Sequence, residues 1–266
     1  MNKIIIIIIA VAAFALAGAA YWFSRDADEI ATNSDALKSN NGPEVTTQNV
    51  VYFENTTGYF ARPKAEGSYP GIVMIHEWWG LNDNIKNMAN ELAKEGYAVL
   101  AVDLYNGTVA ATPEEARTLT GSIKQDKTID NLRAAAGYLR GQGADQIASL
   151  GWCFGGGQSM QLALSGEELD ATVIYYGQLV TDQARLAAIS WPVLGIFGEK
   201  DTSIPTTTVR MFETNLDNAS VRNEVYIYPG VGHAFANPSG ANYAEDETKD
   251  AWAKTLAFLK RSFEQK

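Results

Sequence analysis

The chain contains one cysteine, Cys153, within the segment Gly-Trp-Cys-Phe-Gly-Gly-Gly at residues 151–157. The segment lies between a run of residues typical of a strand and a run typical of a helix. Because glycine has no Cβ, glycines two residues before and two residues after the cysteine allow a strained turn that lifts its side chain above a sheet. We interpret the segment as a nucleophile elbow in which sulfur replaces the usual serine oxygen. The alternative is a small buried hydrophobic residue, the commonest role of a free cysteine.

Asp201 and His233 could complete a catalytic triad with Cys153. Each follows a predicted strand, and open α/β sheets place their functional sites at the carboxyl ends of strands. A thiol with the ordinary pKa of about 8.5 needs a base to become a nucleophilic thiolate. We expect His233 to be that base and Asp201 to orient its ring. Two alternatives remain open: Glu199 lies on the same loop as Asp201 and could replace it, and His233 could be a structural histidine.

A second loop with chemistry-bearing side chains is His-Glu-Trp-Trp-Gly at residues 76–80, directly after a predicted strand. We expect this loop to face the elbow. The backbone N–H groups of Trp78 and Phe154 are then candidates for an oxyanion hole, which stabilises the negative oxygen of an acyl-transfer intermediate. Glu77 could take part in catalysis, stabilise the loop or lie in solvent. We expect His76 to be a hydrogen-bond donor that packs the loop.

The elements that must position these residues alternate between strands and helices. The sequence predicts strands at 50–53, 58–61, 71–75, 97–102, 147–151, 171–176, 193–197 and 224–228. It predicts helices from an N-cap at Asp83 to a stop at Gly96, and at 113–122, 128–140, 155–165, 205–216 and 246–263. Repeated strand–helix units indicate an α/β domain over residues 49–266, with a mostly parallel, doubly wound sheet and helices on both faces.

Residues 1–23 form a separate N-terminal segment, either a signal peptide or a membrane anchor. The apolar run 4–23 is long enough to span a bilayer as a helix, whereas the small residues 17–20 are typical of a signal-peptidase site. Lys3 before the run favours a catalytic body outside the membrane, in the periplasm or the cell exterior, either secreted or tethered to the inner membrane. Residues 24–48 are polar and predict a linker.

Composition narrows the classes of partner. The 31 acidic and 21 basic residues give a formal net charge of −10, which argues against nucleic acid or an anionic membrane surface as a partner. We expect no metal and no cofactor, because the two histidines are far apart, there is no cysteine pair and no dinucleotide-binding glycine motif follows the first strand. A small-molecule substrate is therefore expected. The sequence does not determine the oligomeric state, and we favour a monomer.

Residues 49–266 resemble the dienelactone hydrolase family of the α/β-hydrolase superfamily. The matching features are the elbow at 151–156, the glutamate of the 76–80 loop, Asp103-Leu104-Tyr105, Asp201 in its loop and Gly232-His233-Ala234-Phe235. The resemblance implies an α/β-hydrolase fold and cleavage of ester or lactone bonds through a Cys-His-Asp triad and a thioester acyl-enzyme. It also implies that Glu77 pairs with the cysteine thiol and takes its proton as the substrate binds.

One departure from the family bears on the substrate. The member that hydrolyses dienelactone binds the substrate carboxylate with two arginines, and the corresponding stretches here, 103–107 and 233–237, contain none. Glycine or asparagine cannot imitate a bidentate arginine, so we expect a neutral ester or lactone. The expected pocket is aromatic, although the same residues could be ordinary packing: Trp78, Trp79, Tyr105 and Phe235. The alternative function is an envelope-tethered binding module without catalytic activity, because a fold does not imply an activity.

Overall fold

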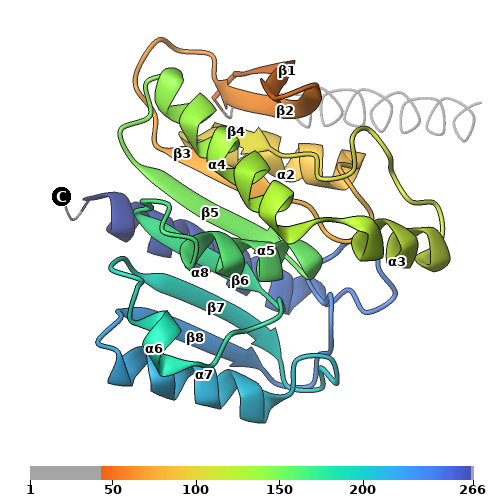
Figure 1. Cartoon of the computed structure of the whole chain (residues 1–266), viewed down its shortest axis with the longest axis vertical. Coiled ribbons are helices and arrows are strands. Elements are labelled where there is room, and N and C mark those ends of the chain that lie inside the picture. The colour runs from red at the N-terminus through yellow and green to blue at the C-terminus, as the bar shows by residue number, and fades with distance from the viewer. Residues whose placement is uncertain (1–42, 265–266) are drawn as a thin grey trace, which may run out of the picture. The chain divides into compact units, whose positions relative to one another are not determined.

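The computed structural model describes residues 43–264, so the predictions for residues 1–42 lie outside the described part of the chain. One eight-stranded sheet has the order β1-β2-β4-β3-β5-β6-β7-β8 (Figure 1). Its strands are β1 (Val45–Phe53), β2 (Thr56–Pro63), β3 (Gly71–Ile75), β4 (Ala98–Ala101), β5 (Ile147–Trp152), β6 (Ala171–Tyr175), β7 (Val193–Gly198) and β8 (Asn223–Tyr228). The helices are α2 (Asp83–Lys94), α3 (Pro113–Ser122), α4 (Gln125–Gly141), α5 (Phe154–Ala163), α6 (Gln183–Leu186), α7 (Thr206–Asn218) and α8 (Glu245–Glu264).

The sheet is mostly parallel, as the strand–helix alternation predicts. β1 pairs with β2, and β2 with β4, in antiparallel register at one edge. All the remaining neighbours, from β4 across to β8, pair in parallel register. Connections between parallel strands carry the helices, so the carboxyl ends of these strands and the loops that follow them lie along one edge of the sheet. The fold is that of an α/β hydrolase.

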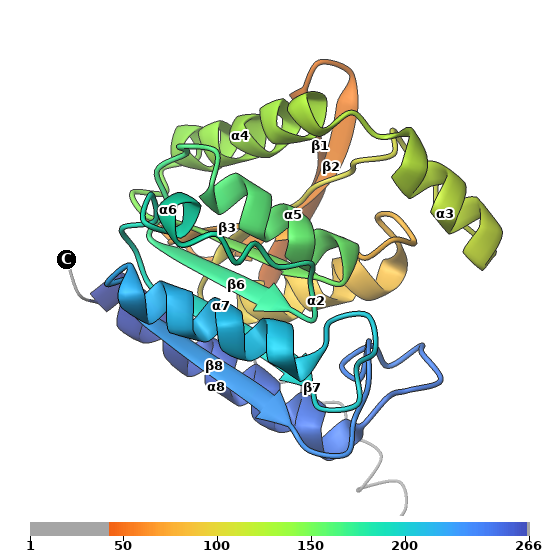
Figure 2. The ribbon, with the colours of Figure 1, turned by 60° about the horizontal axis from the view of Figure 1, so that its bottom comes forward.

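Helices cover both faces of the sheet. Helices α2 and α8 pack on one face, behind the sheet in Figure 1, while α4 and α5 lie side by side on the other face (Figure 2). Strand β3 shows the consequence for sequence: Ile72 and Met74 pack with α2, whereas Val73 and Ile75 pack with α4. A strand covered on both faces must be apolar at every position, which explains why it reads as a continuous apolar run.

Several element boundaries differ from the predictions. β1 begins at Val45, inside the stretch 24–48 that was predicted as a linker. Its residues 46–49 are exposed, because an edge strand with one face in solvent tolerates polar side chains, and this composition is also typical of linkers. The N-cap of α2 is Asn82, whose side chain accepts a hydrogen bond from the N–H of Ile85 at 3.2 Å, so the prediction of Asp83 was wrong by one residue.

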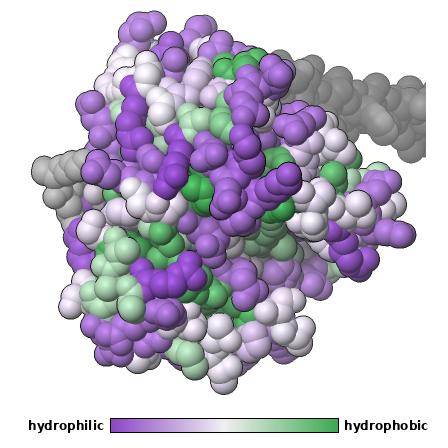
Figure 3. All heavy atoms as spheres, in the orientation of Figure 1, coloured by the Kyte–Doolittle hydropathy of each residue, from purple (hydrophilic) through white to green (hydrophobic). Residues whose placement is uncertain are grey.

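Helix α3 is held to the rest of the described structure by few contacts. Of its residues, only Ala116 is buried, and Figure 2 shows the helix standing away from the sheet layers. Figure 3 shows one face of the molecule, dominated by hydrophilic residues with hydrophobic residues in patches between them. Within residues 43–264, no helix combines the length and the apolar character that a membrane crossing requires.

Candidate functional site

Cys153 occupies the tight turn between β5 and α5. Its φ of 54° and ψ of −116° lie in a region that a side-chain-bearing residue rarely adopts, and strain of this kind is typical of functional sites. A Cβ at Gly151 would overlap the carbonyl oxygen of Gly155, and a Cβ at Gly155 would overlap the carbonyl oxygens of Ile75 and His76. Glycine is therefore required at both flanking positions, which is the strand–turn–helix geometry that the elbow pattern predicts.

Cys153, His233 and Asp201 form a continuous row of contacts. Nε2 of His233 lies 3.1 Å from Sγ of Cys153, and Nδ1 of the same ring lies 2.8 Å from Oδ2 of Asp201. The Asp201 side chain is buried, and its Oδ1 accepts hydrogen bonds from the N–H groups of Ser203 at 2.8 Å and Ile204 at 3.0 Å. The loops after β5, β7 and β8 thus bring together three residues that are far apart in the sequence.

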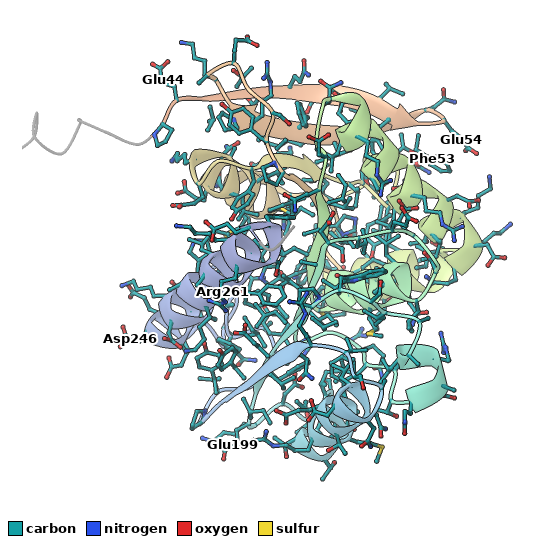
Figure 4. The ribbon with its side chains drawn as sticks, turned by 90° about the vertical axis from the view of Figure 1, so that its left-hand side faces the viewer. Glu44, Phe53, Glu54, Glu199, Asp246 and Arg261 are labelled. Atoms are coloured by element: carbon teal, nitrogen blue, oxygen red, sulfur yellow. The ribbon has the colours of Figure 1, made fainter. Side chains whose placement is uncertain are left out.

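Glu199, the alternative acid, lies elsewhere. Its side chain is exposed and accepts a hydrogen bond from the N–H of Gly230 at 3.0 Å, and Figure 4 shows it at the periphery of the molecule. The carboxylate that contacts the imidazole of His233 is that of Asp201.

The groups beside His233 favour the protonated form of its imidazole. Burial of the His233 ring opposes protonation, but the hydrogen bonds to Asp201 and Cys153 outweigh it and raise the pKa of His233 to about 10. Burial likewise works against the charged form of Asp201, yet its contacts with His233 and with two backbone N–H groups keep the pKa of Asp201 below its usual value. An imidazole that binds a proton this firmly is suited to take one from a thiol.

Glu77 lies beside the row but bonds to a residue that the sequence analysis did not single out. Its side chain is 4% exposed, and its Oε2 accepts a hydrogen bond from Nδ2 of Asn237 at 2.5 Å. Burial raises the pKa of Glu77 to about 7, although the charge of His233 and the Asn237 hydrogen bond partly oppose this shift. The resemblance pairs Glu77 with the Cys153 thiol as the substrate binds, whereas in this ligand-free structure the thiol contacts His233 and Glu77 is bonded to Asn237.

His76 fastens the loop after β3 to the loop after β4. Its ring is fully buried, and its Nε2 accepts a hydrogen bond from the N–H of Leu104 at 3.1 Å. Nδ1 must then carry the proton, which it donates to the carbonyl oxygen of Glu77 at 2.5 Å. Burial lowers the pKa of His76, which keeps the ring neutral. The residue is a loop-packing hydrogen-bond donor, as expected.

The four aromatic residues predicted to line a pocket differ in how far they are exposed. Trp78 and Trp79 are half-buried, with ring centroids 5.0 Å apart. The ring of Tyr105 stacks on that of Phe154, with centroids 5.9 Å apart. The prediction for Phe235 was wrong, because its side chain is 0% exposed and has no surface to offer a substrate.

Phe235 packs instead behind the site. Its ring contacts those of Tyr176, at 5.7 Å between centroids, and Tyr228, at 5.2 Å. The ring of Tyr176 in turn meets that of His233 edge-on at 5.2 Å. Phe235 therefore supports the histidine through Tyr176, a role that spacing along the sequence cannot distinguish from lining a pocket.

Arg117 of α3 was also missed by the sequence analysis. Its guanidinium lies 6.0 Å from the centroid of the Trp78 ring, within the range of a cation–π contact. The helix itself is predicted from its sequence, but the direction in which an exposed helix points is not, so no local signal could have placed Arg117 here.

The chain is similar to proteins of one family. A model of the dienelactone hydrolase family matches residues 56–263. A Salmonella typhimurium relative named "Putative carboxymethylenebutenolidase" is 30% identical over 223 residues, which cover 77% of this chain and 83% of that protein. "Protein usf" from Aquifex pyrophilus is 33% identical over 214 residues, which cover 76% of this chain and 92% of that protein.

A solved structure agrees with these sequence matches. The crystal structure of a "Putative Dienelactone Hydrolase" from Klebsiella pneumoniae superimposes with a TM-score of 0.75 at 28% sequence identity. The superposition covers 82% of this chain and 99% of that one. The family match at residues 56–263 includes strands β2 to β8 and the loops that carry Cys153, Asp201 and His233.

Proposed function

Since the chain belongs to the dienelactone hydrolase family, and is thus a hydrolase of ester or lactone bonds, we propose that Cys153 is its nucleophile. In this proposal His233 is the general base and Asp201 holds the imidazole in the required tautomer. The observation that carries it is the unbroken row of contacts from Sγ of Cys153 through both nitrogens of His233 to Oδ2 of Asp201.

The proposed reaction has two stages. Sγ of Cys153 gives its proton to Nε2 of His233 and attacks the carbonyl carbon, and the tetrahedral intermediate collapses to a thioester when the alkoxide leaving group takes that proton. In a lactone the leaving group stays attached to the acyl chain. Water then attacks the thioester, giving its proton to His233, and the acid is released as Cys153 regains a proton.

The negative oxygen of each intermediate needs donors that are already in place. We assign this role to the backbone N–H groups of Phe154 and Trp78. Phe154 is the first residue of α5, where N–H groups have no partner within the helix and the helix dipole is positive. Trp78 belongs to the loop that the buried His76 ring fixes through its two hydrogen bonds.

Glu77 is proposed as a second acid–base group of the same site. The family resemblance assigns the thiol proton to Glu77 instead of His233 during substrate binding, and a buried carboxyl with a pKa of about 7 is poised for proton transfer near neutral pH. In the free structure its partner is Asn237, so this step would require the Glu77 side chain to change partner.

For the substrate we propose a neutral ester or lactone, because the two stretches that hold carboxylate-binding arginines in the dienelactone-active member contain no arginine. Arg117 is exposed and lies against Trp78. A panel of esters matched in size, neutral and carboxylate-bearing, would show the preference directly.

Replacement of the nucleophile tests the mechanism. Cys153→Ala should reduce kcat/KM on neutral esters by at least about 10³-fold, because other members of the site cannot replace an attacking sulfur. Met211→Ala, at an exposed position on α7, should leave turnover unchanged. Mass spectrometry of the wild-type protein, quenched during turnover, should show the acyl group on Cys153. Undiminished turnover in Cys153→Ala would refute the mechanism, and absence of turnover in the wild type would favour the binding module.

A further inference from the structure

Ser159 of α5 has a hydroxyl group that bonds outside its own helix. Its side chain is 0% exposed, and its Oγ donates to the carbonyl oxygen of Val173 on β6 at 3.1 Å. The same Oγ lies 2.8 Å from Oγ of Ser149 on β5. Hydroxyl groups in helices commonly bond to a carbonyl of the preceding turn, as that of Thr128 does with Lys124 in α4. The hydroxyl group of Ser159 instead ties α5 to the sheet.

Two more buried polar residues continue this contact within the sheet. The hydroxyl groups of Ser149 and Thr172 lie 3.4 Å apart, and Oγ1 of Thr172 accepts a hydrogen bond from Nε1 of Trp191 at 2.9 Å. Ser149 and Thr172 are both 0% exposed. Buried hydroxyl groups without partners would destabilise the interior, so the bonds among them favour one arrangement of the whole set. The hydroxyl group of Ser159 is thus held by a network that spans β5 and β6.

The turn that carries the nucleophile is attached to the same strand. The backbone N–H of Cys153 donates to the carbonyl oxygen of Tyr175 at 3.0 Å. Tyr175 and Val173 are two residues apart on β6, so their carbonyl oxygens point to the same side of the strand. The elbow is therefore fixed to one row of carbonyl groups at two points, the N–H of Cys153 and the hydroxyl group of Ser159.

The backbone between these two points includes Phe154, whose N–H is the proposed oxyanion donor. The three residues after it, 155–157, are glycines and have no side chains with which to anchor the turn. Gln158 bonds to Gln125 of α4 rather than to the sheet. Ser159 is thus the first side chain of α5 that hydrogen-bonds to the sheet, and the orientation of the turn depends on it.

We propose that Ser159 is a positioning residue whose hydrogen bonds direct the N–H of Phe154 toward the oxyanion. The proposal rests on the roles proposed for Cys153 and Phe154. It separates two reactions of the same sulfur. Acyl transfer develops a negative oxygen that needs the donor. Alkylation by iodoacetamide forms a bond from sulfur to a saturated carbon and releases iodide, so it develops no such oxygen.

Removal of one oxygen atom tests the proposal, because Ser159→Ala nearly preserves the shape of the side chain. On a neutral ester, kcat and kcat/KM should both fall about tenfold, since a misdirected donor loses an interaction made only in the transition state. Alkylation of the full-length protein by iodoacetamide at pH 8 should change less than twofold, because the contact between Cys153 and His233 remains. Thr128→Val is the matched control: it removes a buried hydroxyl group that bonds to its own helix, and both rates should stay unchanged.

A second variant keeps the test valid if Ser159→Ala fails to fold. Ser149→Ala removes one partner of Ser159 and leaves the bond to Val173, so kcat should fall by only about threefold, again without an effect on alkylation. Where both single variants fold, the double variant should lose less than the product of the two separate losses, because both substitutions remove the same bond.

Three results would overturn the proposal. Equal falls in turnover and alkylation would assign Ser159 to the stability of the elbow as a whole, a rise in KM alone would assign it to substrate binding, and an unchanged kcat would show that the donor needs no such support. Failure of the proposed nucleophile would appear separately, as turnover that survives Cys153→Ala.

Discussion

At the scale of single residues, three carboxyl groups in and near the site lie in different environments. Asp201 receives two backbone N–H bonds and an imidazole, which favours its ionised form. Glu77 is buried, which raises its pKa to about 7 although the hydrogen bond from Asn237 opposes this shift. Glu199 is exposed. Groups of one chemical type thus acquire different roles from what surrounds them.

Separate replacement of Asp201 and Glu199, the two acids on the loop after β7, tests these roles. Asp201→Asn should lower kcat by up to about 10⁴-fold, because the amide favours the wrong imidazole tautomer and no longer stabilises the protonated ring. Glu199→Gln, two positions away, should retain nearly full activity since its contact is with the N–H of Gly230. Steady-state kinetics on one neutral ester measures both. Equal losses in the two variants would contradict the assignment of Asp201.

At the scale of elements, prediction from sequence worked where one local cause decides the structure. Continuous apolar runs identify the buried strands, and glycine spacing identifies the elbow. Helix α6 was not predicted, because four residues leave too little periodicity to recognise. Contacts between distant loops lie beyond such reasoning: it could place Glu77 and His233 at the same sheet edge, but it could not find that Asn237 bonds to Glu77 or that Arg117 covers Trp78.

The elbow glycines give a prediction about stability. Gly155→Ala should lower the free energy of unfolding by about 1–3 kcal/mol or more, because the new Cβ overlaps backbone carbonyl oxygens of the neighbouring strand end and its loop, which cannot move aside. Gly137→Ala, in the exposed interior of α4 with open space around it, should raise it by up to about 1 kcal/mol. Urea unfolding compares the two variants. A stabilised Gly155→Ala would show that the turn is looser than the contacts indicate.

At the scale of the whole molecule, the hydrolase body is supported by the structure, whereas the role of the N-terminal segment is predicted from the sequence alone. The contacts within residues 43–264 support a hydrolase built on one sheet. The prediction that the protein is exported depends on the apolar run 4–23 and on the charge of Lys3. The formal charge of −10 on the whole chain opposes binding to an anionic membrane surface, so any attachment would have to come from the apolar segment itself.

The predicted export has a direct measurement. Cells expressing the full chain should yield it in the periplasmic or membrane fraction, and intact-mass analysis should show either the whole chain or one cut close to residues 17–20. A body lacking residues 4–23 should remain inside the cell. Equal distribution of the two forms would contradict both the signal peptide and the anchor.

The position of His233 has a consequence for folding. His233 follows β8, the outermost strand of the parallel side, and its partner Cys153 lies 80 residues earlier in the chain. Closing contacts between such distant segments is slow compared with forming helices or neighbouring strand pairs. During refolding, helix content and core burial would recover first, and catalytic activity would return only when the loop after β8 has met the loop after β5. The return of enzyme activity would thus report when this long-range contact between His233 and Cys153 forms.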